Sequence, residues 1–424
     1  MGLALDELRR RHPVFRYEKY AFSPQGEDLL VNFTFHLPPD ITFTPQIIIR
    51  QAAPLTSKLD PSLLNNLVFH LGLIESLSYW KAACSPQIDI QAGALTPTQT
   101  DWWHNLIIKG LGEFFYQNQI DFTLPNFLHL ISCTTGHFGP KTTSVNPDQF
   151  LTLVGGGKDS AVALEVIKTS QQALLLNPTP AALEVAKIAG INNPIIVDRH
   201  IDPKLLDLNQ QGYLNGHTPF SAYLSFLSLL VASLFGYSNI VVANERSSDE
   251  ENITYLGHQI NHQYSKTLDF ERSFREYTAQ YLSPSLNYFS LLRPLWEIQI
   301  SQIFSHYPQY FPVFKSCNVN QKRNSWCGHC AKCLSTFILL YPFMPEAVTS
   351  IFGNNLAQDS QLADLMTHLT GEKLPKPFEC VGTAREIKAA LHSPQDMGVL
   401  LKDWGHDDFL PLPLKVKLKS LIHV

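Results

Sequence analysis

Short apolar runs alternate with longer helical patterns from residue 148 onward. Four runs have the length of buried strands: 150–154, 172–176, 194–197 and 239–243. Three segments between them have the length and apolar spacing of helices: 160–169, 181–189 and 218–235. This strand–helix order predicts a parallel sheet with helices on both faces. In such sheets, ligands bind at the carboxyl ends of the strands.

Residues 1 to 146 have a different pattern, without a phosphate-binding signal. Residues 31–37 alternate apolar and polar side chains, which predicts a half-buried strand. Pro38 and Pro39 end this strand, because proline cannot donate a hydrogen bond to a sheet. Two segments have helical spacing: 63–83 and 99–117. The turn-rich segment 134–147 predicts a domain boundary.

The tail from residue 346 onward shows only helical signals, at 362–369 and 384–391. Thr383 and Glu386 have the spacing of a capping box at the start of the second helix. The chain therefore divides into three parts: a mixed α+β N-terminal domain (1–146), an α/β domain (147–345) and a small helical C-terminal region (346–424).

The first strand of the α/β domain ends in a glycine loop: Gly155, Gly156, Gly157, Lys158, Asp159 and Ser160. Glycine accepts positive φ and lets a ligand approach the backbone closely. The free N–H groups at the start of the following helix, together with the helix dipole, form an anion site, and Lys158 adds a positive charge. Asp159 or Ser160 is expected to cap this helix. The loop is not a Walker A motif, because Asp159 follows Lys158.

The end of the fourth strand is the most acidic strand end. Four carboxylates follow residues 239–243: Glu245, Asp249, Glu250 and Glu251. Carboxylates facing a phosphate site suit Mg²⁺ or acid–base chemistry, and a solvated acidic loop is the alternative for each of them. His258, His262 and Lys266 come next, at four-residue spacing, and would share one face of a helix. A zinc pair is one interpretation, but we favour polar substrate contacts because no H-E-x-x-H motif is present.

Four of the seven cysteines lie close together: Cys317, Cys327, Cys330 and Cys333. Cys-x-x-Cys-x-x-Cys places three sulfurs on one turn, and Cys317 completes a tetrahedral set. We favour a structural Zn²⁺, with an Fe–S cluster as the alternative and His329 as an alternative ligand.

Composition narrows the functional classes. The chain has 424 residues and a net charge of −5, which argues against broad nucleic-acid binding because that requires a basic face. No uninterrupted apolar run is long enough to span a bilayer, and the first ten residues carry charges where a signal peptide has an apolar core. We therefore expect a cytoplasmic protein without a membrane partner.

The loop Gly155-Gly-Gly-Lys-Asp-Ser160 closely resembles Ser-Gly-Gly-x-Asp-Ser, the pyrophosphate-binding loop of the PP-loop ATP pyrophosphatases. The resemblance implies an adenine nucleotide alpha hydrolase-like fold, with ATP bound by residues 155–160. Gly155 stands where that family has serine, so one hydroxyl contact to phosphate is missing. The cysteine cluster resembles the zinc knuckle of the PP-loop enzyme 7-cyano-7-deazaguanine synthase.

Further motifs follow the loop in order: Asn244-Glu-Arg-Ser247, Asn261-His-Gln-Tyr-Ser-Lys266, Trp326-Cys-Gly-His-Cys-Ala-Lys-Cys333 and Lys376-Pro-Phe-Glu-Cys-Val-Gly-Thr383. With Ser78-Tyr-Trp-Lys-Ala-Ala-Cys84 before them, they resemble the bacterial UDP-N-acetyl-α-D-muramoyl-L-alanyl-L-glutamate epimerase family over residues 65 to 390. The resemblance implies that ATP and Mg²⁺ adenylate the terminal glutamate of a UDP-linked muramoyl dipeptide. Epimerisation to D-glutamate, with release of AMP and diphosphate, would serve peptidoglycan precursor synthesis.

Within that reaction, the candidate residues for moving the α-proton are Glu245, Asp249, His262 and Cys380, and the sequence does not choose among them. For Cys380, a buried structural residue is the alternative. Lys158 and Lys266 are candidates for neutralising phosphate charge. Two other functions remain open. One is a PP-loop enzyme that modifies a nucleobase, of the deazaguanine nitrile synthase or tRNA thiolase type, and the other is a nucleotide-binding scaffold without catalysis.

Overall fold

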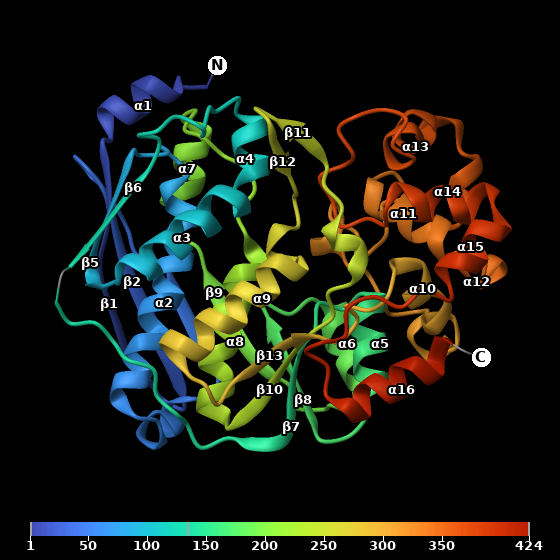
Figure 1. Cartoon of the computed structure of the whole chain (residues 1–424), viewed down its shortest axis with the longest axis horizontal. Coiled ribbons are helices and arrows are strands. Elements are labelled where there is room, and N and C mark those ends of the chain that lie inside the picture. Colours follow the sequence, from blue (N-terminus) through green and yellow to red (C-terminus); the bar gives the residue numbers. More distant parts are fainter. Residues whose placement is uncertain (1, 134, 423–424) are drawn as a thin grey trace.

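A mixed β-sheet forms the centre of the computed structural model, which describes residues 2–133 and 135–422 (Figure 1). Its strands are β1 (Val14–Gln25), β2 (Asp28–Leu37), β3 (Ile41–Phe43), β4 (Gln46–Ile49), β5 (Gln87–Ala94), β6 (His129–Cys133), β7 (Asn146–Leu153), β8 (Gln171–Leu176), β9 (Ile195–His200), β10 (Tyr237–Val242) and β13 (Asn287–Ser290). Within the described residues their order is β13-β10-β7-β8-β9-β4-β2-β1-β5-β6, with β3 paired to β2. A separate hairpin consists of β11 (Ile253–Tyr255) and β12 (His258–Ile260).

The strands from β13 to β9 are parallel, which confirms the parallel sheet that the strand–helix alternation predicts. Beyond them, β4 runs antiparallel to β9, with Ile49 opposite Val197. This pairing continues the sheet from the parallel half into the first 146 residues, where β2 and β1 are antiparallel and β5 and β6 are parallel. The turn-rich segment therefore connects two halves of one sheet. Thr134, its first residue, lies outside the described residues.

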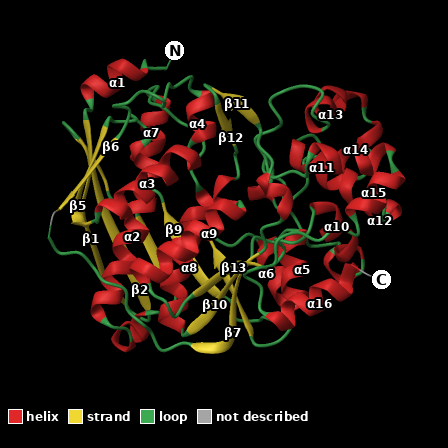
Figure 2. Ribbon diagram, in the orientation of Figure 1, coloured by secondary structure: helices red, strands yellow, loops and turns green. Residues whose placement is uncertain are grey.

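Helices cover both faces of this sheet. They are α1 (Leu5–Arg11), α2 (Pro61–Trp80), α3 (Pro97–Gly110), α4 (Gly112–Gln117), α5 (Lys158–Ile167), α6 (Pro180–Ile188), α7 (Lys204–Gln210), α8 (Phe220–Phe235), α9 (Leu268–Tyr277), α10 (Glu297–Ser305), α11 (Ala331–Leu340), α12 (Pro345–Phe352), α13 (Ala363–Leu369), α14 (Ala384–His392), α15 (Pro394–Leu400) and α16 (Leu412–Ile422). Figure 2 shows α10 to α16 gathered at the end of the molecule opposite β1, β5 and β6. No helix of the described residues is both long and apolar enough to cross a bilayer.

Residues of the parallel strands alternate between two hydrophobic cores. In β8, Leu174 packs into the core that contains α2, α3 and α8, whereas Ala173 and Leu175 pack into the core of α5, α6 and the C-terminal helices. In β10, Ile240 packs into the first of these cores and Val241 into the second. Because successive side chains point to opposite faces, a strand buried on both faces must be apolar throughout. This explains the uninterrupted apolar runs in the sequence.

Helix α2 is buried on almost every side and passes close to the sheet. Asp60 caps its start by accepting hydrogen bonds from the N–H groups of Ser62 and Leu63. Gly72, which interrupts the helical pattern, lies where a Cβ atom would be only 2.0 Å from the Tyr17 hydroxyl oxygen and 2.7 Å from Phe33 Cδ1. The glycine therefore permits the close approach of α2 to β1 and β2.

Two helical expectations need correction. The pattern at 99–117 predicts one helix, but the structure has α3 and α4, which are separated at Leu111. Neither Asp159 nor Ser160 caps α5, because this helix begins at Lys158 and both residues lie in its first turn, with Gly157 in the N-cap position. The capping box of Thr383 and Glu386 at the start of α14 is confirmed.

Replacing Gly72 with alanine should destabilise the protein by about 1–3 kcal/mol, because the added methyl group displaces the Tyr17 ring in a packed core. Gly398 is the matched control, since it is also helical but a Cβ atom there would meet no described heavy atom within 4 Å. Gly398→Ala should be neutral or stabilising by up to about 1 kcal/mol. Urea denaturation followed by circular dichroism measures both changes. Equal effects of the two substitutions would contradict the packing argument.

Candidate active site

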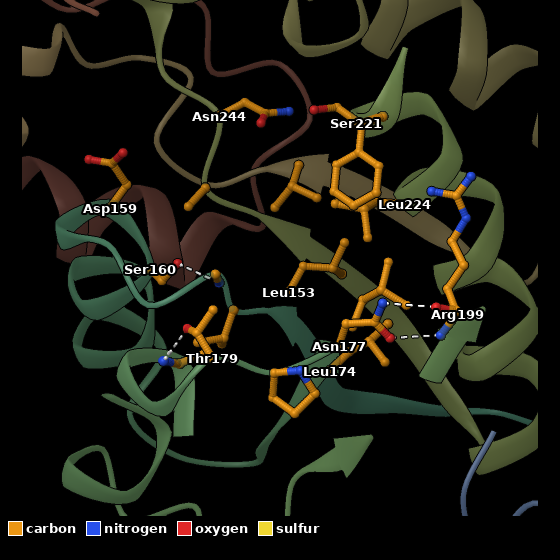
Figure 3. Close-up of a pocket in the computed structure, with 18 of the residues that line it drawn as sticks. Leu153, Asp159, Ser160, Leu174, Asn177, Thr179, Arg199, Ser221, Leu224 and Asn244 are labelled. Carbon is orange, nitrogen blue, oxygen red and sulfur yellow. Dashed lines mark hydrogen bonds between the residues drawn. The ribbon is translucent and has the colours of Figure 1, made fainter. Parts of the chain in front are cut away.

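The glycine loop follows β7 and makes a tight turn into α5 (Figure 3). Gly156 has a φ of 89°, and a Cβ atom there would lie 2.6 Å from the backbone nitrogen of Ala182, so glycine is required. The Ser160 hydroxyl accepts a hydrogen bond from the Gly155 N–H at 3.2 Å and holds the turn closed. The first N–H groups of α5 lack partners within the helix and are directed toward the loop, which is the arrangement of an anion site.

A cavity of about 660 Å³ opens beside this loop, at the carboxyl ends of β7, β8 and β10 (Figure 3). Its apolar wall is formed by Leu153, Leu174, Leu176, Phe220, Leu224 and Val242. Asn177, which has a φ of 44°, exchanges two hydrogen bonds of 2.7 and 3.0 Å with the backbone of Arg199 and stands at the rim. An apolar pocket of this size with a few polar groups suits a nucleoside.

A second cavity, of about 320 Å³, adjoins the first. The two share Gly155, Asp159, Ser160, Thr179, Lys266 and Gln321. The second cavity is also lined by Lys332 and Cys380. If a molecule binds with its phosphate groups on the glycine loop, a group attached to those phosphates would therefore extend into the second cavity.

Glu297, the first residue of α10, is a buried carboxylate beneath the loop. Its Oε1 atom lies 3.0 Å from Nζ of Lys158 and 3.5 Å from Nζ of Lys332. Burial opposes ionisation of Glu297, but the two lysines outweigh it and lower the pKa of this carboxyl to about 2. Lys158 also contacts Asp159 at 2.5 Å, and its ammonium is not among the described groups that line either cavity. Lys315 and Lys332, rather than Lys158, join Lys266 as the lysines of the second cavity.

Cys380 lies against Lys266, with 3.1 Å between Sγ and Nζ. Burial would raise the pKa of the Cys380 thiol, but the charge of Lys266 and a hydrogen bond with His262 lower it to about 5. The residue is therefore a thiolate near neutral pH, which is the reactive form of cysteine. A merely structural cysteine needs no such charged surroundings.

His262 is held between Cys380 and Glu113 of α4. Its Nδ1 atom lies 2.5 Å from the Glu113 carboxylate. Burial would lower the pKa of His262, but its hydrogen bonds with Cys380 and Glu113 raise it to about 9. His217 lies beside it, with 4.4 Å between ring centroids, and burial together with the charge of His262 lowers the pKa of His217 to about 3. The result is a thiolate, an imidazolium and a carboxylate in series.

Donor atoms of Glu113, His217 and His262 lie within 4.8 Å of one another, which is close enough for a shared metal ion. Two observations favour the hydrogen-bonded arrangement instead. His262 and Glu113 already contact each other directly. In addition, Lys81 and Lys266 place positive charge near His217, and this charge opposes a cation there.

The expectation that His258, His262 and Lys266 share a helical face is wrong. Leu256 and Gly257 both have positive φ, of 51° and 80°, and form the two-residue turn of the hairpin β11–β12. His258 therefore lies in a strand, where it is exposed and packs against Phe122 with 5.3 Å between ring centroids. A zinc pair of His258 and His262 is not formed.

None of the four carboxylates after β10 lines either cavity, and among them Glu245 is the one buried near Lys266. Glu245 is buried, which raises its pKa to about 7 although Lys266 opposes the shift. Asp249 accepts a hydrogen bond from the N–H of Leu268, at the start of α9, and lies outside both cavities. Glu250 pairs with Lys376. Glu251 lines a separate cavity between α3 and the β11–β12 hairpin.

The four clustered cysteines converge as expected. Their sulfur atoms lie within 4.8 Å of one another: Cys317, Cys327, Cys330 and Cys333. The N–H groups of Asn320 and His329 donate to the sulfurs of Cys317 and Cys327 at 3.3 and 3.4 Å, as suits thiolates. This donor set fits Zn²⁺. The His329 ring contacts the backbone of Cys327.

The cysteine cluster also positions a residue of the site. Cys330 and Cys333 flank Lys332 at the start of α11, so the cluster fixes the end of the helix from which Lys332 reaches Glu297. Sequence reasoning assigned no role to Lys332, Glu297, Glu113 or His217. Lys332 was visible inside the cysteine motif, but the other three carry no local signal, because an acidic first turn or a lone histidine is common in ordinary helices and loops.

Fold and site together define an α/β protein in which an anion-binding glycine loop lies beside an activated thiolate. The family models for the MurL N-terminal domain and the MurL C-terminal domain match residues 6–291 and 313–408, and the chain belongs to this family. Relatives named UDP-N-acetyl-alpha-D-muramoyl-L-alanyl-L-glutamate epimerase include one from Micromonospora sp. that is 33% identical over 404 residues, covering 91% of this chain and 88% of the relative.

A second relative of the same name, from Salinispora tropica, is 33% identical and covers 91% of this chain and 86% of its own length. A third, from Xanthomonas oryzae pv. oryzae, is 30% identical and covers 89% of this chain and 84% of its own length. The resemblance to the epimerase family is thereby confirmed. No solved structure gives a significant match.

The cysteine cluster predicts one Zn²⁺ per chain. Cys333→Ser should abolish metal binding and lower the midpoint of thermal unfolding by more than about 5 °C, because the metal stabilises only the folded state. Cys133→Ser is the matched control, since Cys133 is exposed at the end of β6. Elemental analysis and thermal melting measure both effects. Iron with visible absorbance would favour the cluster alternative, and metal-free wild type would contradict the prediction.

Proposed function

We propose that this protein epimerises the terminal L-glutamate of UDP-N-acetylmuramoyl-L-Ala-L-Glu after ATP has adenylated its carboxylate. The observation that carries the proposal is that the glycine loop and Cys380 line adjoining cavities. The names of the relatives support the substrate. A free carboxylate makes the neighbouring C–H a very weak acid, since deprotonation would add a second negative charge. Adenylation removes the first charge and allows an enolate to form.

The residues around the loop fit a nucleoside triphosphate. The 660 Å³ cavity would take the adenosine, and the start of α5 would hold phosphate. Because Gly156 lies so close to Ala182, no side chain fits at this position. The turn therefore carries no side chain there that would block a phosphate. Lys266 and Lys332 would balance phosphate charge. Asp159, which lines both cavities, is the residue that would hold Mg²⁺, and the ion would neutralise further phosphate charge.

Glu245 and His262 suit the movement of the α-proton. The buried carboxyl of Glu245 has a pKa of about 7, so it is an effective base near neutral pH. His262 is protonated in the same range, since its pKa is raised to about 9, and can return a proton. Epimerisation requires such a pair, because one group removes the proton and another supplies it on the opposite face.

The alternative functions receive less support. The cysteine cluster suits a nucleobase-modifying enzyme equally well, but the relatives are named as epimerases. A scaffold without catalysis does not require a buried thiolate beside an imidazolium, whose desolvation costs stability. The loop is also open at Gly155, because a Cβ atom there would meet no described heavy atom within 4 Å. The glycine therefore does not indicate a loop that is closed to phosphate.

In deuterium oxide, the wild-type protein with ATP and the UDP-linked dipeptide should place deuterium at the glutamate α-carbon and release AMP in step with product. Asp159→Asn should lower AMP release at least about 100-fold, because the carboxylate that would hold Mg²⁺ at the phosphate site is lost. Asp148→Asn is the control, since Asp148 is exposed near the opposite end of β7. Mass spectrometry and nucleotide chromatography give both readouts. Epimerisation without ATP, or ADP as product, would rule out the adenylate.

The pH dependence tests Glu245. Because the unprotonated carboxylate is the base, kcat/KM should fall about tenfold per pH unit below pH 7, where Glu245 takes up its proton. Glu245→Gln should lower α-deuterium incorporation about 10²–10⁴-fold while ATP–diphosphate exchange persists. Glu251→Gln, at the same strand end but outside the site, is the control. An acidic limb that survives in Glu245→Gln would assign the base to another residue.

A further inference from the structure

The surroundings of Cys380 combine three features that a proton carrier alone does not require. The residue lines the second cavity together with the glycine loop. Lys266 contacts its sulfur at 3.1 Å. On the other side, His262 is oriented by the Glu113 carboxylate. A nucleophile, a histidine and an orienting carboxylate in this order form the usual constellation of covalent acyl transfer.

The low pKa of the Cys380 thiol distinguishes the two roles that a thiolate can have. A base of pKa about 5 is poorly matched to a weakly acidic C–H bond, because proton-transfer efficiency follows basicity closely. Nucleophilicity of a thiolate depends on basicity only weakly, with a Brønsted coefficient of about 0.4–0.5. The low pKa of Cys380 therefore makes it a much weaker base but only a slightly weaker nucleophile. Glu245 has the better pKa for the base.

We propose that Cys380 attacks the adenylated glutamyl carboxyl group and carries the substrate as a thioester during epimerisation. This inference rests on the proposed function. The bond between Sγ and the acyl carbon forms, and the bond from that carbon to the AMP oxygen breaks, with its electron pair leaving on AMP. After the α-proton has been exchanged, water adds to the thioester carbonyl and the C–S bond breaks. The thiolate returns to Lys266, and the proton lost by water passes to solvent.

Two chemical properties suit a thioester to this role. Sulfur donates little electron density to a carbonyl, so the α-hydrogen stays far more acidic than beside a free carboxylate, and the acidification achieved by adenylation is kept. Thioesters also hydrolyse more slowly than acyl-adenylates, which gives the enolate time to form and reprotonate. Lys266 and Lys332, which both line the second cavity, are placed to stabilise the negative oxygen of the enolate.

The test is a rapid-quench single turnover with the UDP-linked dipeptide carrying a radiolabelled glutamate, ATP and excess enzyme. Label should become bound to acid-denatured wild-type protein, up to one per chain, and be released by neutral hydroxylamine. Peptide mapping should place it on Cys380. Glu245→Gln should retain more label, because its thioester cannot enolise. Cys133→Ser, with its exposed cysteine removed, should behave as wild type.

Cys380→Ala should form no labelled protein and lose epimerisation at least about 100-fold, yet keep ATP–diphosphate exchange, which also shows that it is folded. Wild-type protein that epimerises and releases AMP without bound label at any time, in Glu245→Gln as well, would overturn the thioester and leave the proposed function standing. Near-normal epimerisation by Cys380→Ala would overturn it too. By contrast, an ATP-independent wild-type reaction would remove the proposed function itself. If Cys380→Ala does not fold, the labelling of wild type decides.

Discussion

The buried carboxylate of Glu297 is the contact on which the arrangement of the site depends. It brings together α10, the glycine loop through Lys158 and the cysteine cluster through Lys332. Burying a charge costs several kcal/mol, but one lysine at 3.0 Å offsets roughly 5 kcal/mol at an effective dielectric constant of about 20. With Asp159 included, the group contains two positive and two negative charges. Removal of any member would leave the group with an excess charge, so these segments must keep their relative positions.

A second balanced group surrounds the proposed reaction centre. Lys266 and His262 face the negative charges of Cys380 and Glu113. Glu245 and the thiolate share the positive charge of Lys266. The burial of Glu245 therefore outweighs the attraction of that lysine and raises the pKa of the Glu245 carboxyl toward neutrality. The protonation states follow from this distribution of charge rather than from any single contact. Epimerisation benefits directly, because it needs one group that accepts a proton and another that gives one.

The sequence predicted those parts of the fold that depend on local signals. The parallel strands, the glycine loop and the clustered cysteines all follow from residues close together in the chain. The pairing of β4 with β9 has no local signal, because two short strands from distant segments meet only in the folded sheet. The same limitation applies to Glu297, which looks like an ordinary helix start. The shared helical face predicted for residues 258–266 does not form. Four-residue spacing suggests a helix, but Leu256 and Gly257 form the turn of a hairpin instead.

Lys266 couples the two cavities, since it lines both and contacts Cys380. A negative charge bound at the glycine loop would be attracted to the ammonium of Lys266, which also stabilises the thiolate. In the proposed reaction, a bound triphosphate would raise the pKa of the Cys380 thiol, and departure of diphosphate would reverse that shift. In the mechanism proposed above, the fraction of Cys380 present as thiolate would therefore be highest after adenylation has released diphosphate. Attack on the acyl carbon would thus be favoured after the adenylation step that it must follow, and the shared lysine would set the order of the proposed reaction.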